Sequence, residues 1–506
     1  MGALSASLDI AGSGLAAVQR ELALVSQNIA NAGTAGYATE TAAQSALVAG
    51  GQGMGVITQP AIAASDPALQ AELLAQVSQV SGLATQQAAL KPIDQVAGTP
   101  GTGNDLASQI GALQNSFTTL LTDPSNQAQQ AAVVQAAQTV AGQLNGLGNA
   151  TTTARQNAQT AIVSEVGTFN RTLTQIGGLN SQIVAMTAQH QSTADLVNQR
   201  NAAVQTLAQL VSVKTSLQPD GALLVATASG TILPTDGSQT VSTGNATLTP
   251  GSSTVPPITL GGVDITAALT GGQIGANIAL RDTILPTRQA GLDEFAAALA
   301  QRFSAQGLKL FTDAVGNVPT AGVPVQSGYL GFANSVTVNP AVVATPSLVR
   351  DGTQAVVGSA GGASAFTPNP AGGPAGFATM ISRVLNYALG ADVQAGVVQP
   401  AANSSGLGAS GTLSVDYGGS GSVAGLATAM TASQAAAVGD VAGQLSNAQA
   451  VQTGLQSQLQ GETGVSVDNQ LSTMIALQNS YGANAKVMTA VESMFTTLIT
   501  AVTGIA

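Results

Sequence analysis

The chain has 506 residues, enough for about three domains, and only 7% of them are charged, against about 25% in a typical soluble protein. Its 24 acidic and 13 basic residues give a net charge of −11, which argues against a surface that binds nucleic-acid phosphates. Cysteine is absent, and this excludes a disulfide, a thiol nucleophile and a cysteine-bound metal.

The N-terminal residues predict a helix with one continuous apolar seam. Seam residues recur at alternating spacings of four and three residues, the pattern of a coiled coil. They are Leu4, Leu8, Ala11, Leu15, Val18, Leu22, Val25 and Ile29. We expect this helix to pack lengthwise against another helix and to end at Asn31, before a turn that contains Gly33 and Gly36.

Helix start and stop signals divide the next part of the chain. Residues 38–64 are expected to be extended, with a short strand over 56–58. Asp66 and Pro67 are typical of a helix start, and Pro92 is expected to end that helix at about residue 90. Further helices are predicted over 104–121, 124–188 and 194–210.

The apolar pattern changes after the last of these helices, which Thr193 is expected to cap. Alternating apolar residues predict strands from about 211 to 269, with a hairpin turn at Gly221. A helix follows over 275–306 and is expected to bend at Pro286.

The C-terminal part returns to helix after an irregular stretch. Residues 311–425 are rich in Gly, Pro, Ala and Ser and contain short β-like runs, so they predict a β-rich insert with long loops. Helix is predicted again over 426–460, and a turn at 461–464 leads into a second seam. Its residues are Leu471, Met474, Leu477, Tyr481, Met488, Val491, Phe495 and Leu498.

Together these elements predict a mainly α fold with β-rich insertions, in an elongated and nested multidomain architecture. We expect paired terminal coiled-coil helices, a long helical bundle and a β-rich outer insert. The expected domains are 1–40 with 465–506 as a terminal core, 41–310 with 426–464 as a helical rod with a β subdomain near 211–272, and 311–425 as the outer insert. The alternative for the two seams is a pair of amphipathic helices within one monomeric bundle.

The sequence offers no active site. The single histidine, His190, lies near an expected loop without the partners that a metal ligand or a catalytic base requires. Asp293 and Glu294 are interpreted as a pair on a helix surface rather than an acid/base dyad. No catalytic, cofactor-binding or metal-binding residue is therefore predicted. No apolar run is long enough to span a membrane, and no cleaved secretory signal is visible at the start.

Short motifs near both ends resemble those of a known family. Residues 26–31, Ser-Gln-Asn-Ile-Ala-Asn, followed by Gly36 and Tyr37, resemble the N-terminal motif of flagellar rod, hook and hook-associated proteins. The terminal helix from residue 464 onward is similar to that of the hook-associated members. Residues 195–200 and 275–303 favour the same members, because hook and rod relatives lack the long helical stretch between the termini.

One position departs from the family pattern. After Tyr37 the family often continues with Thr and Arg, whereas this chain has Ala38, Thr39 and Glu40. A contact that this Arg makes in relatives is therefore in doubt here.

The resemblance implies a structural component of the bacterial flagellum, an adaptor that joins hook to filament by helix-mediated subunit assembly. It implies self-assembly in a ring, the hook protein and a second junction protein as neighbours, and a cytoplasmic export chaperone on the C-terminal helix. It places the protein outside the cell after type III export without a cleaved signal, and it implies neither an enzyme nor a cofactor. Deletion of about 315–420 is expected to leave motility mostly intact. The alternatives are a secreted adhesin or another axial protein of the hook or rod.

The residues expected to contact neighbouring subunits come from both ends. Those in the N-terminal part are Leu4, Leu8, Leu15, Val18, Leu22, Val25, Asn28, Ile29, Asn31, Gly36 and Tyr37. The eight residues of the C-terminal seam complete the set.

Overall fold

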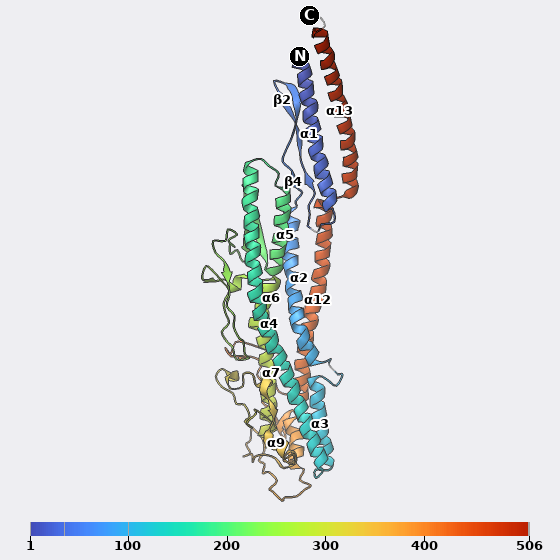
Figure 1. The fold of residues 1–506 in the computed structure, drawn as a ribbon. Coiled ribbons are helices and arrows are strands. Elements are labelled where there is room, and N and C mark those ends of the chain that lie inside the picture. The colour runs from blue at the N-terminus through green and yellow to red at the C-terminus, as the bar shows by residue number, and fades with distance from the viewer. Residues whose placement is uncertain (1, 35, 100, 504–506) are drawn as a thin grey trace.

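The computed structural model describes residues 2–34, 36–99 and 101–503 as a long, thin molecule with both termini at one end (Figure 1). The first helix, α1 (Gly2–Asn31), runs away from that end, and the last helix, α13 (Val467–Thr503), runs back to it beside α1. Helices dominate the rest of the chain as well, so the predicted mainly α class with paired terminal helices is confirmed.

Long helices form the rod below this terminal pair. They are α2 (Pro67–Ala97), α3 (Leu106–Thr122), α4 (Gln127–Ala188), α5 (Ala194–Leu210), α7 (Leu285–Ala305) and α12 (Val423–Thr463). Asp66 begins α2 as predicted, because its carboxylate accepts hydrogen bonds from the N–H groups of Ala68 and Leu69. Thr193 was expected to do the same for α5, but its side chain makes no capping hydrogen bond.

The predicted stop at Pro92 is wrong, because α2 continues through this proline to Ala97. Leu90 and Ile93, on either side of it, are 2% and 1% exposed in the core. Their burial is favourable only while the chain stays helical, and this outweighs the hydrogen bond that proline cannot donate.

A π-helical turn precedes Pro286. Helix α6 (Gly272–Ala279) passes into the π-turn Leu280–Ile284 and then into α7, so the proline stands at the start of α7. The wider turn suits a residue that lacks an N–H group. Within it, Arg281 is fully buried, and its guanidinium donates to Gln159 Oε1 at 2.8 Å and to the Pro256 carbonyl at 3.1 Å. This side chain ties α4 to the β-containing segment.

The strands are short and antiparallel. The two-stranded sheets are β1 (Glu40–Thr41) with β4 (Ile62–Ala63), β2 (Gln44–Ala49) with β3 (Gln52–Thr58), β5 (Val213–Leu217) with β6 (Leu223–Thr227), β10 (Phe311–Thr312) with β11 (Thr337–Val338), and β12 (Asp392–Gln394) with β13 (Val397–Val398). The remaining sheet has the order β7 (Val241–Ser242), β8 (Thr259–Leu260), β9 (Val263–Asp264). The hairpin predicted around Gly221 is confirmed as β5–β6, and Gly221 has the positive φ of 88° that the turn requires.

Segment 311–425 differs from the expected β-rich insert. Its strands are only two or three residues long, and its helices are α8 (Phe332–Ser335), α9 (Pro340–Ala344), α10 (Leu348–Asp351) and α11 (Thr379–Arg383), followed by the π-turn Val384–Ala388. It shares one hydrophobic core with α3, α4 and α7, because Val342, Val349, Met380 and Ile381 are all 0% exposed within that core. Small residues and turns prevent long strands here, yet enough apolar side chains remain to bury the segment.

The second core lies nearer the terminal pair and joins α2, α4 and α5 to strands β5–β8. None of the described helices carries an apolar stretch long enough to cross a membrane.

Asp293 and Glu294 are buried, so their interpretation as a surface pair is wrong. Asp293, 0% exposed on α7, accepts hydrogen bonds from the N–H groups of Gly331 and Ala333 at 2.8 and 2.9 Å. Glu294 accepts from the Tyr329 hydroxyl at 2.7 Å. Burial raises the pKa of Asp293 to about 7. Both carboxyl groups therefore hold the irregular segment against α7.

Asp293→Ala is expected to lower the free energy of unfolding by about 1–3 kcal/mol for each amide left unpaired. Urea unfolding of the full chain measures the change. Asp440→Ala is the matched control, because Asp440 is exposed on α12. Equal stability of the two variants would contradict a holding role for Asp293.

Candidate assembly site

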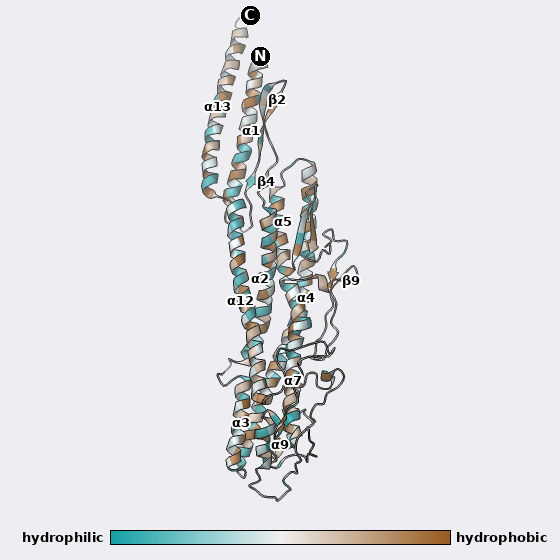
Figure 2. Ribbon diagram, turned by 180° about the vertical axis from the view of Figure 1, so that it is seen from behind, coloured by the Kyte–Doolittle hydropathy of each residue, from teal (hydrophilic) through white to brown (hydrophobic). Residues whose placement is uncertain are grey.

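The two predicted seams meet each other within one chain. Val18, Val25 and Leu477 form a small core that is 7%, 5% and 8% exposed, and Leu22, Ile29 and Met474 pack against it. Figure 2 shows α1 and α13 side by side, with β2 next to α1, at the end where the termini lie. The seam arrangement therefore holds the terminal pair together before any neighbour is added.

The other seam residues differ in how far they are covered. Val491 is buried, whereas Leu471 and Tyr481 are 45% and 38% exposed. The half-buried ones are Leu4, Leu8, Leu15, Met488, Phe495 and Leu498. Much of the predicted interface is thus used within the chain, and the exposed side chains lie mainly outside the seam.

A hydrogen-bonded joint connects the terminal pair to the rod. Asn28 of α1 is 1% exposed, and its side chain pairs with the backbone of Glu40: Nδ2 donates to the carbonyl, and Oδ1 accepts from the N–H, both at 2.9 Å. The Tyr37 hydroxyl also donates to Asn28 Oδ1 at 3.0 Å. Asn28 was predicted to contact a neighbouring subunit, but these bonds commit its side chain to the joint.

A second asparagine holds the same segment from the rod. Asn198 of α5 accepts from the Ala38 N–H at 3.2 Å and donates to Glu40 Oε1 at 3.2 Å. On a third side, Thr39 N–H donates to the carbonyl of Thr463, at the end of α12, at 2.8 Å. Residues 38–40 are therefore fixed to α1, α5 and α12 together.

The remaining predicted residues of this region lie around the joint. Asn31 donates to the Gln27 carbonyl at 3.1 Å, and Gly36 is exposed with a φ of 79°, which favours glycine. Sequence reasoning missed Glu40 and Asp195 as parts of the joint. The single signal in the sequence was the departure from the family pattern after Tyr37, which includes Glu40 but not Asp195.

Among the residues that the structure describes, no cationic side chain pairs with Glu40. Its pKa rises from the usual 4.5 to about 7, first because the carboxyl group is buried and then because Asp195 is close. Burial, together with Glu40, also raises the pKa of Tyr37 to about 12. The folded joint consequently favours a protonated Glu40.

This shift predicts a joint that weakens as the pH rises. A folded-state pKa above the unfolded one gives stability that is complete below about pH 4.5 and is lost as the pH passes through about 7. Glu40→Gln, which keeps a neutral side chain, is expected to flatten this dependence. Hydrogen exchange of the backbone amide at position 40 measures it in both proteins at pH 5.5 and pH 8, about 2.5 units apart across the transition. An equal pH dependence in both proteins would contradict the proposed protonation.

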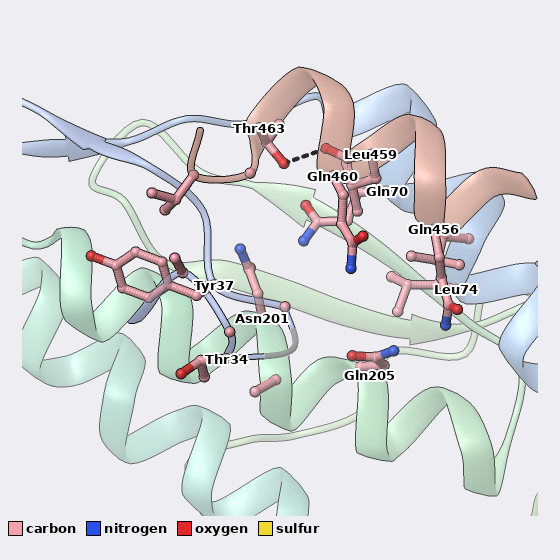
Figure 3. A pocket seen from close by; sticks show the side chains of 17 residues that line it. Thr34, Tyr37, Gln70, Leu74, Asn201, Gln205, Gln456, Leu459, Gln460 and Thr463 are labelled. Atoms are coloured by element: carbon pink, nitrogen blue, oxygen red, sulfur yellow. Dashed lines mark hydrogen bonds between the residues drawn. The ribbon is translucent and has the colours of Figure 1, made fainter. Parts of the chain in front are cut away.

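A cavity of about 440 Å³ lies beside the joint, between α2, α5, α12 and the turn after α1. Figure 3 shows Gln205 on α5 facing Gln456 and Gln460 on α12 across this space. The described lining residues include no charged side chain, and amides do not titrate. The other polar groups of the lining are the hydroxyls of Thr34, Tyr37 and Thr463, so the cavity suits neutral hydrogen-bonding groups. Among the residues that the structure describes, no cluster of His, Asp and Glu could hold a metal ion.

Comparisons with known families match both ends and the rod. Residues 8–37 match a family described as flagella basal body rod protein, and residues 459–501 match the C-terminal family of flagellar basal body rod FlgEFG proteins. Residues 90–317 match the flagellar hook-associated protein FlgK helical domain. The terminal matches fall on α1 and α13, the two helices of the pair.

Individual relatives are also flagellar hook-associated proteins. The chain is 31% identical to flagellar hook-associated protein 1 of Salmonella typhimurium over 332 residues, which are 62% of this chain and 58% of the relative. It is 30% identical to the protein of the same name in Escherichia coli over 321 residues, 60% of this chain and 57% of the relative. The chain thus spans a little over half the length of these relatives.

A solved structure of the flagellar hook junction protein FlgK from Burkholderia pseudomallei aligns with 49% of this chain and 45% of its own at 26% identity. Its TM-score of 0.40 is too low to bear on the fold. The sequence matches confirm the resemblance that the terminal motifs predict.

Proposed function

We propose that this chain, a relative of flagellar hook-associated protein 1, is a structural subunit of the bacterial flagellum that joins the hook to the filament. The observation that carries the proposal is the terminal pair. Its two helices come from opposite ends of the chain, match families of flagellar rod proteins, and stand on a rod that matches the FlgK helical domain. An extended subunit of this kind can contribute helices to a common core while its rod projects outward.

The proposed domains follow from the separation between the terminal helix pair and the rod. Residues 1–40 with 465–506 form the core unit of the assembly, and residues 41–310 with 426–464 form the rod. Segment 311–425 is an outer part that packs on the rod. The joint at residues 38–40 supports a fixed angle between core and rod, because three elements hold it. Copies of the chain form a ring, with the hook protein on one side and a second junction protein on the other.

The exposed side of α13 supports a further partner before assembly. Leu471, Ile475 and Met494 are 45%, 60% and 50% exposed, and uncovered apolar side chains of this size favour aggregation. A cytoplasmic export chaperone on α13 would cover them until the subunit leaves the cell by the type III route. The mature protein is then extracellular and acts as a structural part, not as an enzyme.

Localisation tests this function directly. Immunogold labelling of isolated flagella should place the chain at the boundary between hook and filament. Cells that lack the gene should retain hooks and release flagellin into the medium. Label spread over the cell surface would favour an adhesin, and label along the hook or rod would favour another axial protein.

A further inference from the structure

The terminal pair has a third layer, the hairpin β2–β3. Strand β3 lies against α1, where the Val56 N–H donates to Ser13 Oγ at 3.1 Å. Strand β2 lies beyond β3, and every residue of it is exposed. Leu47 and Val48 on β2 are 42% and 59% exposed, and Met54 on β3 is 43% exposed. The hairpin therefore ends the layer with an apolar and unpaired edge.

The opposite edge of the layer is α13. Its buried residues Leu477 and Val491 face α1. Val487 and Met494, 48% and 50% exposed, lie one turn before and one turn after Val491, so they flank the side of the helix that faces α1. Ala483 and Ala490 are also exposed and complete this flank, the Val487–Met494 side of α13. Nothing in the described chain covers this side.

The two edges lie at the same height along the layer. Ser13 bonds to the hairpin, and its neighbour Gly14 lies beside Asn484 of α13. Because α1 and α13 run in opposite directions, residues 483–494 stand level with the hairpin across α1. Figures 1 and 2, seen from opposite sides, both place β2 and α13 on the two flanks of α1.

Charge does not oppose burial of either edge. No charged residue occurs between Glu40 and Asp66, so the whole hairpin is neutral. On α13, Glu492 lies away from the Val487–Met494 side, and the exposed Lys486 borders it one turn from Ala483 and Ala490, where its ammonium group can stay in solvent. The apolar side chains of the two edges can therefore be buried against each other without an unpaired buried charge.

We propose that the β2–β3 hairpin of one copy packs against the Val487–Met494 side of α13 in the next copy. This inference rests on the proposed function, in which copies assemble side by side. Because the two surfaces are different and lie on opposite edges, the contact is head-to-tail, and repetition closes a ring or extends a helix. The seam between α1 and α13 stays within each chain, and the hairpin makes the contact between chains.

Crosslinking in flagella tests this contact, and the absence of natural cysteine removes any background. The double variant Val48→Cys/Met494→Cys is produced in cells, and isolated flagella are treated with a short bis-maleimide. A head-to-tail contact should give a ladder of dimers, trimers and larger species. Either single variant alone should stay monomeric, and co-expression of the two single variants should give dimers only.

The control and the contrary outcomes are distinct. Val357→Cys paired with Met494→Cys should give no ladder, because Val357 is 94% exposed but lies in the outer segment. Dimers from one single variant alone would mean that like surfaces meet, and this would overturn the head-to-tail contact. If the double variant is present in flagella but gives no crosslinked ladder, the contact is overturned and the proposed function is unaffected. A chain that is absent from flagella would remove the proposed function itself.

Discussion

Leu22→Asp combined with Val25→Asp is expected to abolish swimming while hooks still form. Val25 is 5% exposed in the seam between α1 and α13, and Leu22 packs against the same small core. Placing an unpaired carboxylate in such a site costs several kcal/mol. Arg20 is the single basic residue of α1, so little compensation is available. The pair should separate, and flagellin should appear in the medium.

The measurement is swimming in soft agar, with immunoblots for the chain and for released flagellin. Gln19→Asp combined with Ala23→Asp is the matched control, because both positions are on the exposed side of α1 and add the same charge. This control should swim. Normal swimming of the Leu22/Val25 variant at normal protein levels would show that the seam does not hold the assembly unit.

Deletion of residues 315–420 is expected to unfold the lower rod, contrary to what the sequence pattern predicts. Val342, Val349 and Met380 from this segment are 0% exposed in the core that α3, α4 and α7 share. Each fully buried side chain of this kind contributes roughly 1.5–3 kcal/mol. Several of them together match the whole net stability of a domain, about 5–15 kcal/mol.

Thermal unfolding and limited proteolysis of the purified chain measure this loss. Two point variants in the same segment test whether the stability comes from its buried side chains. Val349→Asp should lower the melting temperature strongly, whereas Val357→Asp should not, because Val357 is 94% exposed. If the chain without residues 315–420 keeps its melting temperature and is still exported, the segment does not stabilise the rod.

The sequence by itself determined the long elements. Heptad spacing identified both terminal helices, because a seam such as Val18 to Val25 repeats within one helix and needs no knowledge of its partner. Capping at Asp66 and the turn at Gly221 were readable for the same reason, since both depend on residues a few positions apart. The terminal motifs also identified the related family.

Only the tertiary structure decided how these elements are joined. Asn28 and Asn198 are far apart in the sequence, and neither pattern nor spacing indicates that both hold residues 38–40. Asp293 looked like a surface residue because its partners, the amides of Gly331 and Ala333, come from an irregular loop. Such hydrogen bonds depend on which distant backbone segments come into contact, and the local periodicity of the sequence does not predict those contacts.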